Sequence, residues 1–121
     1  MRKLLLGDEA IAQAAIDSGL SGVYAYPGTP STEITEFIQL REEKRGEAQD
    51  KIFCRWATNE KTAMEGALGM SYMGKRALVC MKHVGMNVAA GPFVNSAVTG
   101  VNGGFVVVAA DGTSMRSSWN Q

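Results

Sequence analysis

The sequence of 121 residues has no excess of charge of either sign, because twelve lysines and arginines balance twelve aspartates and glutamates. Such a balance gives no reason to expect a nucleic acid or an anionic membrane as partner. No apolar run approaches the roughly 18 residues that a membrane-spanning helix needs. The apolar start at residues 4–6 is also too short for a secretory signal. We therefore expect a globular, cytoplasmic protein with neither a nucleic-acid nor a membrane partner.

Cysteine and histidine are scarce, with two cysteines and one histidine in the whole chain. Cys54 and Cys80 lie in apolar, strand-like runs, which predicts buried free thiols in a reducing compartment. His83 has no second histidine to join it, and the two cysteines are too far apart in sequence for a local ligand motif. We therefore expect no metal site in this chain.

Apolar, strand-like segments alternate with helical patterns along the whole chain. The strands are predicted at residues 22–26, 52–56, 76–81 and 104–110. The third of these is almost continuously apolar, as in a strand that is buried on both faces. Alternation of this kind predicts an α/β fold, in which helices cover both faces of a parallel sheet.

Helix boundaries follow from capping residues and prolines. Pro30 is predicted at the first position of the second helix, with Thr29 as its cap. A third helix is predicted from Thr58 or Asn59 to about residue 73, and a fourth over residues 88–98. The charged segment at residues 41–47 is predicted to be a solvated helix end.

Three unusual segments directly follow predicted strands, at residues 26–32, 57–60 and 82–87. In open α/β sheets, ligands bind beyond the carboxyl ends of the strands. We therefore expect all three segments to line the same edge of the sheet and to form a site there.

Glu60 is the main candidate residue of that site. It precedes Ala63 and Met64 by three and four positions, so it shares their inward helix face, whereas Glu65 falls outside it. An acid in a first turn often does no more than complement the helix dipole. The alternative is a carboxylate in an apolar cleft, suited to sharing a proton with a ligand nitrogen. Position alone leaves both roles open.

Lys82 and His83 lie together after the third predicted strand. A lone histidine is often structural, but a cationic pair at a strand end also suits an anionic substrate such as a carboxylate. These two roles remain open as well.

Three motifs, in this order, resemble a known family. The segment YPGTPSTE at residues 26–33 resembles the opening motif of the pyrimidine-binding domain of 2-oxoacid:ferredoxin oxidoreductases. The segment NEKTAMEGALG at residues 59–69 resembles the helix of thiamine-diphosphate enzymes that carries their essential glutamate. The segments MKHVGMNVAA at 81–90 and TGVNGG at 99–104 are similar to the alpha subunits of indolepyruvate ferredoxin oxidoreductases. The resemblance covers nearly the whole chain.

The resemblance implies a role for each candidate residue. Glu60 would act in catalysis by hydrogen-bonding the pyrimidine ring nitrogen of thiamine diphosphate. His83 would be a second catalytic residue, and Thr29 and Lys82 would contact the substrate. Pro27, Gly28 and Asn87 would join Glu60 in binding the cofactor. The family decarboxylates an aryl pyruvate, passes the electrons through iron–sulfur clusters to ferredoxin, and transfers the acyl group to coenzyme A.

Family members of this kind are several times longer than this chain. The sequence has no Gly-Asp-Gly motif for diphosphate and magnesium, and no Cys-x-x-Cys cluster. The resemblance therefore implies that residues 1–121 are a pyrimidine-binding domain truncated at its C-terminus and inactive alone. A pyrophosphate-binding domain or beta subunit would complete the site, together with the absent iron–sulfur domain, in a homo-oligomer. Two alternatives are the small subunit of a two-subunit sulfopyruvate-type decarboxylase and a non-catalytic dimerisation domain.

Overall fold

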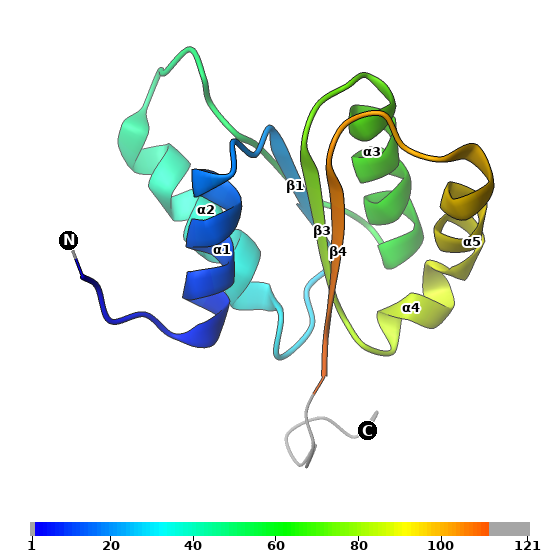
Figure 1. Cartoon of the computed structure of the whole chain (residues 1–121). Coiled ribbons are helices and arrows are strands. Elements are labelled where there is room, and N and C mark those ends of the chain that lie inside the picture. The colour runs from blue at the N-terminus through cyan, green and yellow to red at the C-terminus, as the bar shows by residue number, and fades with distance from the viewer. Residues whose placement is uncertain (1, 112–121) are drawn as a thin grey trace.

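Four short strands form one sheet in the computed structural model, which describes residues 2–111 (Figure 1). The strands are β1 (Gly22–Ala25), β2 (Phe53–Trp56), β3 (Ala77–Lys82) and β4 (Phe105–Ala110). They lie in the order β2-β1-β3-β4, and every neighbouring pair is parallel. The predicted parallel sheet is confirmed. All four strands therefore end at one edge, which we call the carboxyl edge, and begin at the opposite amino edge.

Helices cover both faces of the sheet, as the alternating pattern predicted. One layer contains α1 (Gly7–Asp17) and α2 (Thr32–Arg45), and the other contains α3 (Glu60–Tyr72), α4 (Gly85–Val88) and α5 (Ala90–Thr99) (Figure 1). Each layer has its own apolar core against the sheet. Ile34 and Ile38 are buried in the first core, and Ala63 and Met64 in the second.

Strand β3 lies between these two cores. From Ala77 to Met81 its residues are all buried, with no more than 3% of any exposed. The continuous apolar run in the sequence has this physical cause, since each face of the strand contacts a helical layer. Burial of each larger side chain stabilises the fold by about 1.5–3 kcal/mol.

Two predicted helix boundaries are wrong. Helix α2 begins at Thr32, not at Pro30, and Ser31 is its N-cap residue. The preceding loop bonds to itself instead: the Ser31 hydroxyl donates to the Gly28 carbonyl at 2.9 Å, and the Gly28 N–H donates to Thr32 Oγ1 at 2.9 Å. The helix predicted over residues 88–98 is two helices, α4 and α5, which meet at Ala89.

The predicted solvated end of α2 is also wrong for one residue. Glu42 is 2% exposed, because it faces inward between two arginines. Its carboxylate accepts hydrogen bonds from Arg41 at 3.0 Å and from Arg45 at 2.9 Å. A charge this well buried is retained because it is paired.

Both cysteines are free thiols, as predicted, but only Cys80 is fully buried and Cys54 is half-buried. Burial raises the pKa of Cys54 to about 11 and that of Cys80 to about 12. Both thiols are therefore protonated at neutral pH, which makes them poor nucleophiles. Among the described residues, no helix is both long and apolar enough to cross a membrane.

Candidate functional site

The three loops predicted to form a site do meet at the carboxyl edge, and two glycines show how closely. A Cβ atom placed on Gly85 would lie 2.6 Å from Cγ of Glu60, so the loop after β3 touches the start of α3. A Cβ atom on Gly28 would lie 2.9 Å from Cβ of Lys82, so the loop after β1 touches the end of β3. The segments that follow β1, β2 and β3 are thus in contact.

Glu60 is held at the first position of α3 by reciprocal capping. The Thr62 N–H donates to Asn59 Oδ1 at 2.9 Å, and the Asn59 N–H donates to Thr62 Oγ1 at 3.4 Å. These bonds stop the helix from extending backwards through Asn59. The Glu60 side chain is half-buried and packs on Gly85, while Ala63 continues the same face into the core. The carboxylate therefore has both a favourable helix dipole and a defined position at the carboxyl edge.

His83 lies beside an acid that sequence reasoning missed. Its Nδ1 atom is 3.6 Å from Oδ1 of Asp111, and 22% of the imidazole is exposed. The His83 N–H also donates to the Ala110 carbonyl at 2.9 Å. Parallel pairing places Lys82 opposite Ala110 in register, so the residues that follow the two strands must lie side by side. That pairing is the signal by which Asp111 could have been found.

The remaining predicted residues lie on the same loops with more exposure. Pro27 and Thr29 are exposed on the loop after β1, and Asn87 is exposed on α4. Gly28 and Lys82 are half-buried. The structure thus gathers all the predicted residues at one edge, but the contacts that it shows directly are Glu60 with Gly85 and Lys82 with Gly28.

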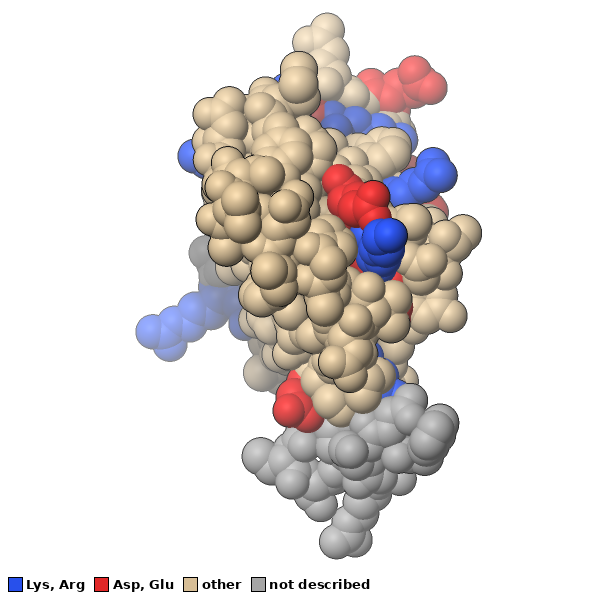
Figure 2. All heavy atoms as spheres, turned by 90° about the vertical axis from the view of Figure 1, so that its right-hand side faces the viewer, with Lys and Arg blue, Asp and Glu red and all other residues tan. Residues whose placement is uncertain are grey.

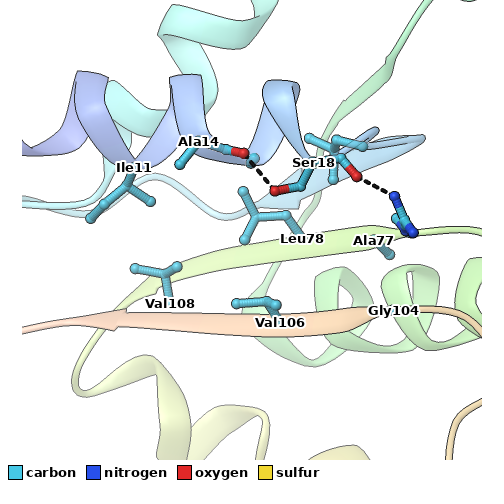
Figure 3. A pocket seen from close by; sticks show the side chains of 11 residues that line it. Ile11, Ala14, Ser18, Ala77, Leu78, Gly104, Val106 and Val108 are labelled. Carbon is cyan, nitrogen blue, oxygen red and sulfur yellow. Dashed lines mark hydrogen bonds between the residues drawn. The ribbon is translucent and has the colours of Figure 1, made fainter.

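A separate apolar groove of about 340 Å³ lies on the side of the molecule, between α1 and β4 (Figure 3). Its polar groups already bond to one another: the Ser18 hydroxyl donates to the Ala14 carbonyl at 2.8 Å, and Arg76 donates to the Ser18 carbonyl. The other walls are aliphatic, including Ile11 and Val106, which is 57% exposed. The groove is an incompletely covered side of the sheet and lacks groups for catalysis.

Within residues 2–111, no group of three or more histidine, cysteine or acidic side chains gathers in a way that could hold a metal ion.

Comparison of the structure with solved structures identifies the fold. No family model matches the chain. A solved 2-oxoglutarate:ferredoxin oxidoreductase from Magnetococcus marinus shares the fold, with a TM-score of 0.73 over 91% of this chain and 18% of that chain. Its sequence is 24% identical, so this likeness concerns the fold alone. The fold is therefore one that occurs within a 2-oxoacid:ferredoxin oxidoreductase.

Curated proteins that are similar in sequence are subunits of one kind of oxidoreductase. The chain is 46% identical over 120 residues to indolepyruvate oxidoreductase subunit IorA of Thermococcus kodakarensis, and 48% identical over 118 residues to that of Archaeoglobus fulgidus. These matches cover 99% and 97% of this chain but 18% and 19% of the relatives. The resemblance drawn from the three motifs is thus confirmed. The chain is similar over nearly its whole length to part of an oxidoreductase subunit, and spans less than a fifth of it.

Proposed function

We propose that residues 1–121 belong to the pyrimidine-binding domain of a cytoplasmic, thiamine-diphosphate-dependent oxidoreductase that decarboxylates aryl pyruvates such as indolepyruvate. The observation that carries this proposal is the placement of Glu60, half-buried against Gly85 where the three motif loops meet. The similarity to IorA subunits of indolepyruvate oxidoreductases supports the substrate class. Ferredoxin as the electron acceptor is supported by the fold shared with a 2-oxoglutarate:ferredoxin oxidoreductase. The two free cysteines fit a reducing compartment.

The residues present fit thiamine diphosphate. Capping bonds already hold the Glu60 carboxylate in place at the start of the helix. It can therefore accept a hydrogen bond from an N–H of a heteroaromatic ring without losing further conformational freedom. Pro27, Gly28 and Asn87 lie on the loops around it and would complete the contacts to the ring. When bound, thiamine diphosphate would supply carbanion chemistry at the keto carbon of a 2-oxoacid. Its magnesium and diphosphate would be held by a domain outside this chain.

The substrate carboxylate would be held by the chain's own cations. Lys82 and His83 are half-buried next to the loop that carries Thr29. Oδ1 of Asp111 lies 3.6 Å from His83 Nδ1, so its charge would attract a protonated imidazole. Glu60 would hold a proton at the cofactor ring nitrogen, and Lys82, His83 and Thr29 would orient the 2-oxoacid.

A partner domain would cover the layer formed by α3, α4 and α5. Residues 83–110 contain no lysine, arginine, aspartate or glutamate, and Figure 2 shows that this side of the molecule is mostly uncharged. Val94 and Val98 on α5 are 63% and 80% exposed. Exposed apolar groups gathered in this way mark interaction surfaces. The partner would be the pyrophosphate-binding part of the enzyme, or a beta subunit, within a homo-oligomer. Coenzyme A and the iron–sulfur clusters would engage parts of the enzyme outside this chain.

The proposal is tested by Glu60→Gln in the full enzyme, assembled from the complete subunit and its partner. The rate of ferredoxin reduction with indolepyruvate and coenzyme A should fall at least about a hundredfold. The glutamine amide has the shape of the glutamate side chain but cannot share a proton with the cofactor ring nitrogen. Glu65→Gln is the matched control, since Glu65 lies on the same helix and is exposed. Full activity of Glu60→Gln would contradict the role of Glu60.

The same assay separates the alternatives. Release of an aldehyde without reduction of ferredoxin would assign the chain to a two-subunit, sulfopyruvate-type decarboxylase. Failure of the assembled enzyme to decarboxylate any 2-oxoacid would assign it to a non-catalytic dimerisation domain.

A further inference from the structure

A second cavity, of about 460 Å³, opens at the amino edge of the sheet, at the opposite ends of the strands from Glu60. Three connections line it: those between α1 and β1, between α2 and β2, and between α3 and β3. We call it the amino-edge pocket. Its size falls in the range of small-molecule sites in proteins.

Cations gather around this pocket. The lining includes Arg41 and Arg45 from α2, Lys51 from the connection to β2, and Lys75 from the connection to β3. The acids near them are Asp50, which also lines the pocket, and the buried Glu42 behind it. Four cations against two acids leave an excess of two positive charges. The whole chain has no net charge, so this excess is a local feature.

The two arginines are already positioned. Arg45 donates to both Glu42 and Asp50, and Arg41 donates to Glu42. Since Glu42 is 2% exposed, it anchors both guanidinium groups from below while other N–H groups remain available to a ligand. Within the described part of the chain, neither Lys51 nor Lys75 takes part in an ion pair. The unneutralised charge of the pocket therefore lies on these two lysines.

The other walls of the pocket are apolar. They are formed by Ile16, Leu20, Ile52 and Met70. Ile52 is 6% exposed, and the other three are half-buried. A ligand that fits the amino-edge pocket therefore has an anionic group, which binds the cationic side chains, and a compact apolar group, which packs against these walls.

We propose that the amino-edge pocket binds a small phosphorylated molecule that carries an apolar or aromatic group. A phosphate monoester brings about two negative charges at neutral pH, which matches the local excess. Guanidinium and ammonium groups both bind phosphate oxygens, and the arginines can do so with paired N–H donors. The proposal is independent of the role of Glu60, since the two sites share no residue.

Titration of the chain with phenyl phosphate and with inorganic phosphate, followed by amide NMR at constant ionic strength, tests the proposal. Both probes should bind saturably with shifts centred on residues 19–21 and 49–52, and phenyl phosphate should bind more tightly because it also reaches the apolar walls. Absence of saturable binding at millimolar concentrations would overturn the proposal. Equal affinities for the two probes would overturn the part assigned to the apolar walls.

Variants identify the residues responsible. Lys51→Gln combined with Lys75→Gln should weaken the binding of phenyl phosphate at least about tenfold. Both lysines are exposed, so the fold should survive the change. Lys44→Gln is the matched control, because Lys44 is exposed on α2 but does not line the pocket. An equal loss of affinity in the control would show that phenyl phosphate responds only to the net charge of the protein. That result would contradict the assignment of the two lysines to the pocket.

Discussion

The glycines at the two edges of the sheet have different neighbours. At the amino edge, a Cβ atom on Gly103 would lie 2.1 Å from the carbonyl oxygen of Lys75, which is backbone. At the carboxyl edge, Cβ atoms on Gly85 and Gly28 would instead meet the side chains of Glu60 and Lys82. The first kind of glycine allows two stretches of main chain to approach each other. The second kind allows a candidate site residue to take its position, so substitutions at the two edges should damage different properties.

The largest effect is expected for Gly103→Ala. Gly103 donates its N–H to the Ser71 carbonyl at 2.7 Å, and its carbonyl accepts from the Ser71 hydroxyl at 2.7 Å, so it cannot move away from Lys75 without breaking these bonds. The free energy of unfolding should fall by about 3 kcal/mol or more, measured by urea denaturation. Gly104→Ala is the control, because its new methyl group would meet only the flexible side chain of Arg76, whose nearest atom, Cγ, lies at 3.3 Å. Equal losses in the two variants would remove the distinction between backbone and side-chain neighbours.

A smaller effect is expected for Gly85→Ala, and it should depend on Glu60. The methyl group would displace the Glu60 side chain, at a cost of about 1–3 kcal/mol in unfolding free energy. In a Glu60→Ala background most of this cost should disappear, because the nearest atoms belong to Glu60 and only Cβ of Met81, at 3.2 Å, remains close. Gly91→Ala is the control, since nothing lies within 4 Å of its new methyl group.

Gly85→Ala, Glu60→Ala and the double variant form a double-mutant cycle. It is measured by the free energy of unfolding and needs no enzyme assay. If Gly85→Ala costs the same with and without the Glu60 side chain, the two residues are not in contact, and the geometry of the carboxyl edge is wrong.

The smallest effects concern two acids, one near each edge, with opposite signs. At the amino edge, the hydrogen bond and charge of Arg45 lower the pKa of Asp50 below its usual 3.8. Near the carboxyl edge, partial burial raises the pKa of Asp8 above 3.8, and a hydrogen bond and repulsion from Glu33 add to the rise. Asp50 therefore stabilises the fold above pH 3.8, and this contribution is lost as the pH falls through its folded pKa. Asp8 acts oppositely, since its stabilising protonated form is lost as the pH rises above 3.8 through its raised pKa.

Urea denaturation between pH 3 and pH 7 measures both acids. At neutral pH, Asp50→Asn should lower the denaturation midpoint slightly, and Asp8→Asn should raise it. The gain from Asp8→Asn should stay below about 0.5 kcal/mol, because water screens a largely exposed pair. Both differences should shrink towards acid pH, and two shifts of the same sign would contradict the comparison.

Much of the fold follows from local pattern. Burial alone explains two patterns: the continuous apolar run of β3 and the inward helix face that includes Ala63 and Met64. Both patterns are visible in the order of apolar and polar residues along the sequence. The meeting of the three loops follows from parallel topology, which makes every strand end at one edge. These are the parts that sequence reasoning predicted correctly.

The parts that it missed depend on contacts between distant residues. In the sequence, Glu42 is one of several charged residues at a polar helix end, which predicts a solvated side chain. Only the folded chain buries it between two arginines. Asp111 approaches His83 only because β4 pairs with β3. Helix α2 begins at Thr32 because Ser31 and Thr32 make local hydrogen bonds with Gly28 in the preceding loop. Such bonds compete with those of a helix, and helix propensities of single residues do not describe this competition.

The strand order also bears on how the chain assembles during synthesis. Strand β1 is made first, yet its two hydrogen-bonding neighbours, β2 and β3, both come later in the sequence. One backbone edge of β1 must therefore wait unpaired until about residue 56 has left the ribosome, and the other edge until about residue 82. This inner strand is the first segment of the sheet to be made, yet its edge towards β3 stays open the longer of the two. During that interval a chaperone or a neighbouring nascent chain has its best opportunity to bind β1.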